Sequence, residues 1–189
     1  MGNFNFEELA IKGAYKILPF YHEDERGYFI KDFDANIFAQ NGMGEINFRE
    51  EFYSMSAKGV VRGMHFQTKA PQSKIVSCIC GKIYDVVVDL RKDSPTFGKY
   101  IGVELSEENH ISLFVPQGCA HGFIALADKT ITYYKCDRDY LKDNDATIRW
   151  DDPNIGIKWP LDQVEKVILS DRDAAAMSFD FFCDTYGGL

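Results

Sequence analysis

Hydrophobic residues recur in short runs along most of the chain, and polar or turn-forming residues separate these runs. The runs are rich in Val, Ile, Tyr and Phe, which favour β-strands. They cover residues 14–20, 27–33, 45–55, 59–67, 74–80, 82–90, 100–105, 111–116, 122–127 and 130–136. Gly81-Lys82 and Asp93-Ser94-Pro95 are among the turn signals between them. The pattern therefore predicts ten short strands.

Helical signals are few. Residues 34–42 favour a helix with Asp34 as its N-cap, and Ser170 precedes a second short helix over 171–177. Strands and helices do not alternate, and neither G-x-G-x-x-G nor G-x-x-x-x-G-K-[ST] occurs, so a doubly wound nucleotide-binding sheet is disfavoured. We expect an all-β, cupin-like jelly roll with a few short helices, including one near the C-terminus, forming one domain over 1–189.

The composition narrows the functional classes. A chain of 189 residues is long enough for one domain with a sizeable core. A net charge of −8 disfavours nucleic acid or an anionic membrane as the main partner. The five cysteines provide neither a disulfide framework nor paired C-x-x-C zinc ligands. The N-terminal segment has acidic residues and no long apolar stretch, so we expect no signal peptide, no membrane span and a cytoplasmic location.

A jelly roll encloses a cavity, so its inward-facing polar residues are candidates for chemistry. Arg62 and His65 share one predicted strand, Lys74 begins the next, and His121 and Tyr134 lie further along the chain. A cupin metal site would need H-x-H, a carboxylate and a third histidine, so we predict no metal. Histidine, tyrosine and lysine together suit proton abstraction beside a carbonyl, which needs no cofactor. Taken singly, each of these residues could also have a purely structural place. A histidine or tyrosine could be packed in the core, and a lysine or arginine could lie solvated at the edge of the sheet.

Several blocks of the sequence resemble one enzyme family. The blocks are DERGYF (24–29), GVVRGMHFQ (59–67), KIVSCICGKIYDVVVDLRKDSPTFG (74–98), LFVPQGCAHGF (113–123), YYKCDRDY (133–140), WDDPNIGIKWP (150–160) and LSDRDAA (169–175). Their order and spacing are similar to those of the dTDP-4-dehydrorhamnose 3,5-epimerases over nearly the whole chain. The resemblance implies a metal-free jelly roll that forms homodimers. It also implies inversion of C3 and C5 of a nucleotide-linked 4-keto-6-deoxy sugar, in deoxysugar and surface polysaccharide biosynthesis.

The resemblance also implies roles for individual residues. His65 matches the base that removes the proton, Asp173 its carboxylate partner, and Tyr134 the acid on the opposite face. Lys74 matches the lysine beside the keto oxygen, and Arg62 matches the arginine that binds the diphosphate. Further substrate-binding positions are matched by Arg26, Phe29, His121 and Tyr140. Asp85 either lies near the base or satisfies buried polar groups.

Three substrate-binding positions depart from the family pattern. Lys31 stands where the family has glutamate, and Glu50 and Phe52 replace the glutamine and asparagine of a Q-x-N motif. These positions lie beside the nucleotide in the family, and the first comes from the partner subunit. A lysine can only donate hydrogen bonds, and a phenylalanine can only stack. Two hypotheses remain open: a CDP- or GDP-linked sugar or another keto-sugar such as a heptose, or a dTDP sugar with compensating contacts.

Other activities and an oligomeric state complete the predictions. The nearest alternative is a C3-only epimerase of a CDP-, GDP- or dTDP-linked 4-keto hexose or heptose. A non-catalytic sugar-nucleotide-binding jelly roll, a metal-dependent cupin oxygenase and an isomerase that relocates the ketone also remain open. The aromatic-rich N-terminal strands are prone to pairing at their edges, so we expect a homodimer that exchanges N-terminal strands.

Overall fold

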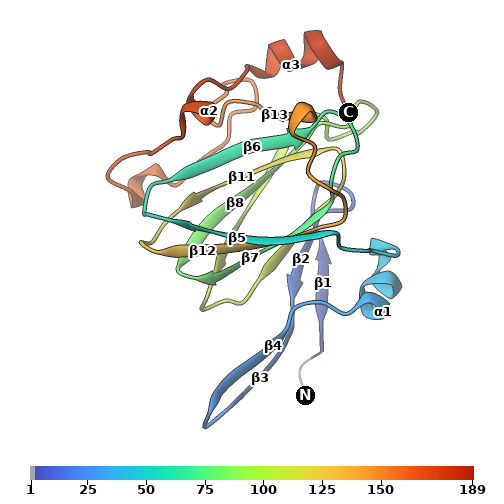
Figure 1. Cartoon of the computed structure of the whole chain (residues 1–189), viewed down its shortest axis with the longest axis vertical. Helices are drawn as coiled ribbons and strands as arrows, with labels where there is room; N and C mark the ends of the chain where they lie inside the picture. Colours follow the sequence, from blue (N-terminus) through green and yellow to red (C-terminus); the bar gives the residue numbers. More distant parts are fainter. Residues whose placement is uncertain (1–2) are drawn as a thin grey trace.

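The computed structural model, which describes residues 3–189, confirms a mostly β architecture of two facing antiparallel sheets (Figure 1). The six-stranded sheet contains, in order across it, β1 (Asn5–Glu8), β2 (Tyr15–Leu18), β10 (Ser112–Val115), β7 (Lys74–Cys80), β12 (Thr130–Cys136) and β5 (Glu50–Ser56). The five-stranded sheet contains β13 (Asp145–Thr147), β6 (Val61–Gln67), β11 (Cys119–Ala125), β8 (Lys82–Asp89) and β9 (Tyr100–Ser106). This is the predicted jelly roll; residues 1 and 2 of the predicted domain lie outside the described residues.

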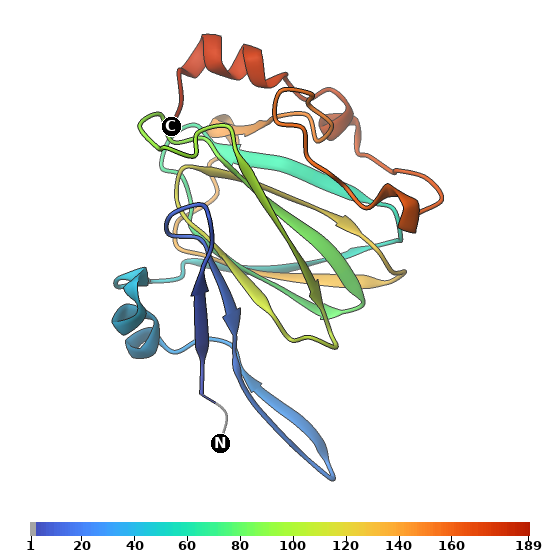
Figure 2. The ribbon, with the colours of Figure 1, turned by 180° about the vertical axis from the view of Figure 1, so that it is seen from behind.

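A hairpin of β3 (Phe20–Asp24) and β4 (Gly27–Lys31) stands apart from both sheets. Figures 1 and 2 show it projecting beyond the body of the molecule, at the end opposite the C-terminal helices. The predicted strand 14–20 is therefore wrong in its extent, because Pro19 separates β2 from β3. Proline lacks a backbone N–H and interrupts strand pairing at this position.

Other boundaries also differ from the sequence-based expectation. The predicted strand 45–55 begins only at Glu50, and residues 45–49 are irregular. The short strands β1 and β13 were not predicted, because runs of three or four residues show too little alternation to be recognised.

Short helices follow the capping signals. Asp34 and Ser170 are N-caps as predicted, since each side chain accepts a hydrogen bond from a backbone N–H three residues later. The helix after Ser170 is shorter than the predicted 171–177, and the last helix was not predicted. The helical segments are α1 (Ala35–Phe38), the irregular η1 (Ala39–Met43), η2 (Lys142–Asn144), η3 (Leu161–Gln163), α2 (Asp171–Ala174) and α3 (Phe179–Tyr186). None of the helices within residues 3–189 is long and apolar enough to cross a membrane.

The five-stranded sheet is buried on both faces, and β8 shows why its sequence is almost continuously apolar. Ile83 and Val87 point into the core between the two sheets. Val86 and Val88 point the other way, into a second core that includes Phe182 of α3. The C-terminal segment thus covers the outer face of this sheet, as Figure 1 shows for α2 and α3. A strand covered on both faces loses the alternation of a half-exposed strand.

Glycines allow two central strands to approach closely beside the candidate site. Gly63 of β6 has φ +136, and a Cβ there would come within 2.5 Å of the Cα of Gly122 on β11. Any larger residue would push β6 and β11 apart and displace His65, which pairs with His121 in this register. The close approach of the two backbones therefore explains Gly63 and Gly122.

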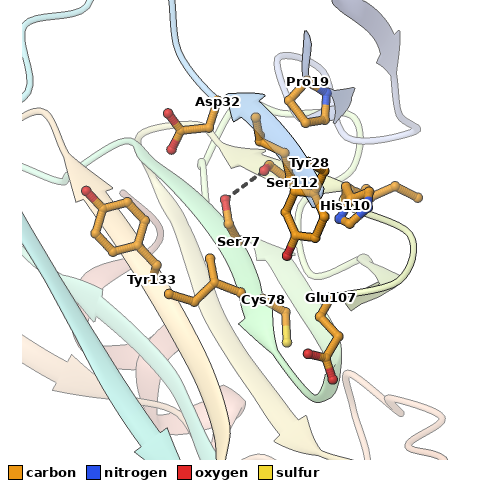
Figure 3. Close-up of a pocket in the computed structure, with 12 residues that line it drawn as sticks. Pro19, Tyr28, Asp32, Ser77, Cys78, Glu107, His110, Ser112 and Tyr133 are labelled. Carbon is orange, nitrogen blue, oxygen red and sulfur yellow. Dashed lines mark hydrogen bonds between the residues drawn. The ribbon is translucent and has the colours of Figure 1, made fainter. Parts of the chain in front are cut away.

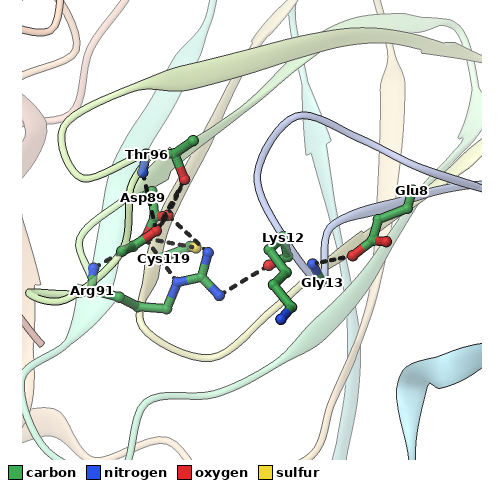
Figure 4. A network of polar contacts seen from close by, with 8 residues as sticks. Glu8, Lys12, Gly13, Asp89, Arg91, Thr96 and Cys119 are labelled. Atoms are coloured by element: carbon green, nitrogen blue, oxygen red, sulfur yellow. Dashed lines mark hydrogen bonds and ion pairs between the residues drawn. The ribbon is translucent and has the colours of Figure 1, made fainter.

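A buried carboxylate fastens the end of β8 to the turn that follows it (Figure 4). Asp89 accepts hydrogen bonds from Nε and Nη2 of Arg91, each at 2.8 Å, and from Thr96 Oγ1 at 2.6 Å. Arg91 also donates to the carbonyl of Lys12 at 2.9 Å, which ties this turn to the N-terminal loop. Burial opposes ionisation of Asp89, but the hydrogen bonds from Arg91, Ser94 and Thr96 outweigh it and lower its pKa to about 2.

Candidate active site

His65 and Asp173 form the central pair of the candidate site. His65 lies on β6, and its Nε2 is 2.6 Å from Oδ1 of Asp173, which lies on α2. The His65 side chain is 33% exposed, whereas that of Asp173 is 5% exposed. The imidazole is therefore the accessible member of the pair. Their sequence positions are far apart, and the packing of the C-terminal segment on the five-stranded sheet brings them together.

Asp173 is held in place by its own helix N-cap. Ser170 Oγ accepts a hydrogen bond from the Asp173 backbone N–H at 3.1 Å and donates one to Asp173 Oδ2 at 2.9 Å. Burial is the largest influence on the Asp173 pKa and raises it, but the hydrogen bonds from His65 and Ser170 together leave the pKa below its usual range. Asp173 is therefore ionised at neutral pH and can orient the His65 ring through Nε2.

A cavity of about 140 Å³ lies in front of this pair. Its lining combines catalytic and binding candidates with residues that were not predicted. These are Phe52, His65, Phe66, Gln67, Pro71, Gln72, Lys74, Cys119, Tyr140, Asp145 and Arg172. The predicted base and the predicted cation, His65 and Lys74, therefore share one cavity although they lie on different sheets.

Tyr134 lies on β12 of the facing six-stranded sheet, behind Phe52, and does not itself line this cavity. It lies directly opposite Phe52 of β5, and the two rings stack with centroids 4.8 Å apart at an interplanar angle of 20°. Tyr134 is only 8% exposed, whereas Phe52 is 47% exposed and lines the cavity. Burial, and then the charge of Asp85, raise the pKa of Tyr134, so its hydroxyl keeps its proton at neutral pH.

Asp85 pairs with His121 and not with His65. Asp85 Oδ1 lies 2.7 Å from His121 Nε2, and both side chains are almost completely buried. Burial raises the pKa of Asp85. The His121 ring meets Tyr134 edge-on, with centroids 6.0 Å apart. The sequence left two roles open for Asp85, and the structure places it with a second buried histidine.

Arg62 lies on the inner side of β6 but does not line the cavity. Its Nε donates to Ser56 Oγ at 3.1 Å and its Nη2 donates to the carbonyl of Met55 at 3.2 Å. Its positive charge is close enough to lower the pKa of Tyr134, although burial dominates that pKa. The guanidinium thus lies near the tyrosine side of the site.

A polar network that the sequence did not reveal closes the rim of the cavity. Tyr140 donates through its hydroxyl to Asp145 Oδ2 at 2.8 Å and through its backbone N–H to Glu50 Oε1 at 2.9 Å. Arg172 contacts the same Asp145 oxygen at 2.6 Å and donates to Thr147 Oγ1. Arg172 had a signal, because it precedes Asp173 within LSDRDAA, but Asp145 had none.

Three predicted binding residues lie away from this cavity, on or beside the hairpin. Arg26 has an 84% exposed side chain and pairs with Asp24, and Phe29 is 60% exposed. Lys31 pairs with Asp34 at 2.5 Å. Within this chain, the structure does not bring these residues to His65.

A larger hollow, of about 370 Å³, lies elsewhere (Figure 3). It is enclosed by hairpin residues such as Tyr28 and by the outer face of the six-stranded sheet, where Ser77 and Ser112 hydrogen-bond at 2.7 Å. His110 of this hollow stacks on Tyr21 of the hairpin, with centroids 4.7 Å apart. None of the predicted catalytic residues lines it.

Metal ligation and thiol chemistry have little support in the described residues. No group of three or more His, Cys, Asp or Glu side chains within residues 3–189 is arranged to hold a metal ion. The five cysteines are free thiols, and burial raises the pKa of Cys78 and Cys119 to about 12. Such thiols remain protonated at neutral pH and are poor nucleophiles.

The arrangement suits proton transfer across a bound ring. A histidine oriented by a carboxylate lies on the five-stranded sheet, a neutral tyrosine lies on the facing six-stranded sheet, and a lysine of the six-stranded sheet lines the same cavity as the histidine. These groups can remove a proton from one face of a carbon beside a carbonyl and return a proton to the other face.

Comparison with known proteins agrees with this chemistry. A family model described as dTDP-4-dehydrorhamnose 3,5-epimerase matches residues 8–180. The dTDP-4-dehydrorhamnose 3,5-epimerase of Methanothermobacter thermautotrophicus is 49% identical over 173 residues, which cover 92% of this chain and 93% of that relative. The enzyme of the same name from Shigella flexneri is 42% identical over 84% of this chain and 88% of that relative.

Solved structures give the same result. A dTDP-6-deoxy-D-glucose-3,5-epimerase from Legionella pneumophila, in complex with dTDP-4-keto-L-rhamnose, superposes with a TM-score of 0.90 at 38% identity, covering 94% of each chain. A 3′-monoepimerase from Streptomyces bikiniensis, in complex with dTDP-quinovose, superposes with a TM-score of 0.87 at 31% identity, covering 95% of this chain and 89% of that one. Similar structures therefore include both double and single epimerases.

Proposed function

We infer the reaction from the premise that this chain belongs to the dTDP-4-dehydrorhamnose 3,5-epimerase family. The protein is a carbohydrate epimerase that inverts C3 and C5 of a nucleotide-linked 4-keto-6-deoxy sugar in deoxysugar biosynthesis. The resemblance drawn from the sequence blocks is thus confirmed over most of the chain. The residues that perform the reaction and the assembly of the site are proposals.

We propose that His65 removes the proton next to the C4 ketone. The C–H bond breaks, its electron pair moves into the carbonyl to form an enolate, and the proton stays on the imidazole. Ionised Asp173 stabilises the imidazolium that forms. The observation that carries this proposal is the 2.6 Å contact between His65 and Asp173 at the wall of a cavity shared with Lys74. Lys74 stabilises the negative charge on the enolate oxygen.

Tyr134 returns a proton to the opposite face of the same carbon. The raised pKa of Tyr134, caused mainly by burial, keeps its hydroxyl protonated before the reaction. Each inversion leaves a tyrosinate and an imidazolium. Before the next one, the imidazolium releases its proton to solvent and the tyrosinate takes a proton from solvent. Inversion needs groups on both faces of the sugar ring, and His65 and Tyr134 come from facing sheets.

Solvent deuterium incorporation tests this mechanism. The enzyme is incubated in D₂O with a 4-keto-6-deoxy sugar linked to dTDP, CDP or GDP, and the label is followed by NMR. Deuterium at C3 and C5 that disappears in His65→Asn supports the proposal, and label at C3 alone indicates a single epimerase. Binding of a nucleotide sugar without exchange would support a non-catalytic protein, and migration of the ketone would indicate an isomerase.

The nucleotide base remains a separate proposal. We propose that Arg62 binds the diphosphate, and Tyr140 offers an exposed ring for a base. Among the three replaced positions, Glu50 accepts a hydrogen bond from the Tyr140 backbone, Lys31 pairs with Asp34, and Phe52 stacks on Tyr134, so each has a partner within the chain. We therefore propose a dTDP sugar held by other contacts, which competition among dTDP, CDP and GDP checks. Clearly tighter binding of CDP or GDP would contradict this.

We further propose that two subunits complete each other's sites. The projecting β3–β4 hairpin carries Arg26 and Phe29, exposed and far from the cavity of their own subunit. The outer face of the six-stranded sheet exposes Tyr53, Met55 and Ile79 at 71%, 60% and 53%, a surface that a second copy can cover. Size-exclusion chromatography with light scattering should give a dimer, and Tyr53→Glu should weaken it. A wild-type monomer would contradict this proposal.

We also propose a cytoplasmic location and one folded domain. The free cysteines fit a reducing compartment. Cell fractionation tests the location, and limited proteolysis tests the domain, because cleavage into two stable fragments would contradict it.

A further inference from the structure

Phe52 is placed to control the orientation of Tyr134. The two residues face each other on neighbouring strands, where side chains on the same face of the sheet are in direct contact. The 4.8 Å separation and 20° angle are those of an offset stacked pair. This contact covers one face of the tyrosine ring along its length.

His121 contacts the Tyr134 ring from the facing five-stranded sheet. The histidine ring stands at 80° to the tyrosine ring, and Asp85 holds it by a 2.7 Å contact. Tyr134 thus contacts the Phe52 ring within its own sheet and a histidine held by Asp85 in the facing sheet.

The Tyr134 ring is buried, whereas the Phe52 ring is half exposed, and this difference bears on how Phe52 can act on Tyr134. Tyr134 is 8% exposed, and Phe52, at 47%, lies on the side of the cavity that contains His65 and Lys74. Removal of the Phe52 ring would open space beside Tyr134 and admit water there. Because Phe52 is half exposed, its removal should leave the fold intact.

We propose that Phe52 is a positioning residue that fixes the orientation of the Tyr134 ring by stacking on it, so that the tyrosine proton reaches the face of the substrate opposite His65. Phe52 has no donor or acceptor and takes no part in proton transfer itself. The inference rests on the proposed roles of His65 and Tyr134.

The two halves of the reaction can be measured separately. Proton removal and return by His65 alone introduce deuterium from D₂O without changing the configuration. Inversion additionally requires Tyr134. Phe52→Ala should therefore keep the rate of deuterium exchange within about threefold of wild type, while the rate of inversion falls by about tenfold or more. Phe52→Tyr, which keeps a stacking ring, should retain both rates.

Two comparisons make the result decisive. Phe181→Ala removes an exposed ring on α3, away from the cavity lining, and should change neither rate. Thermal unfolding of each variant checks that the fold is kept. A parallel fall of exchange and inversion in Phe52→Ala, or no change in either, would overturn the positioning role. If the wild-type enzyme shows neither exchange nor inversion, the proposed function fails instead.

Discussion

At the scale of single residues, the site depends on Asp173, whose two carboxylate oxygens contact two different side chains. It receives the His65 imidazole on Oδ1 and the Ser170 hydroxyl on Oδ2. One carboxylate thus fixes the start of α2 and the orientation of the proposed base. The hydrogen bonds that hold its pKa down keep it anionic, which is the state that can stabilise a charged imidazole.

Asp173→Asn should lower kcat by about 100-fold or more, with a small change in KM, because the amide can present N–H to His65 and favour the wrong tautomer. The measurement is the rate of inversion by NMR. Asp171→Asn, an exposed change in the same helical turn, is the matched control and should be near wild type. Equal activity of the two variants would exclude Asp173 from the mechanism.

At the scale of elements, the strands are fixed to their turns by buried polar groups as well as by apolar packing. Asp89 joins the end of β8 to Arg91, Ser94 and Thr96, and Arg91 continues to Lys12. β8 also carries Asp85, so the hydrogen bonds to Asp89 fix the same strand that positions Asp85 beside the site. A completely buried carboxylate contributes stability here only while it is ionised and hydrogen-bonded.

Asp89→Asn should reduce the free energy of unfolding at pH 7 by about 2 kcal/mol, which is the value of a pKa lowered to about 2 from its usual range near 4. Because the pKa in the folded state is depressed, this stabilisation is complete above pH 5 and is lost as the pH falls towards 2. Urea unfolding at pH 7 and pH 3 should therefore show a smaller difference between variant and wild type at pH 3. Asp93→Asn, exposed in the same turn, should show no such difference.

At the scale of the whole molecule, one subunit is an incomplete site under our proposal. The cavity holds His65, Lys74 and Tyr140, while Arg26 and Phe29 lie on a hairpin that reaches away from the body (Figure 2). Closed two-fold symmetry would place each hairpin at the same position on the partner. The hollow in Figure 3 and the exposed outer sheet face then lie within the proposed contact region.

Mixed dimers test this arrangement directly. One subunit carries His65→Asn, the other carries Arg26→Ala with Phe29→Ala, and different affinity tags allow the heterodimer to be purified. If hairpins act in the partner's site, one of the two sites is intact and activity should be about half that of wild type. Each parent homodimer should be nearly inactive. A heterodimer without activity would show that the hairpin does not serve the partner's site.

The sequence alone predicted the jelly roll, most strands, both N-caps and the pair His65 and Asp173. Alternation and capping are local signals, and the family blocks carry their residues with them. It did not predict β1, β13 or α3, since short elements are stabilised mainly by their neighbours. Tertiary structure alone decided that Asp85 pairs with His121, that Asp145 and Arg172 close the rim, and that Phe52 stacks on Tyr134. Those contacts join residues distant in the chain, and their geometry exists only after two sheets and the C-terminal segment have packed together.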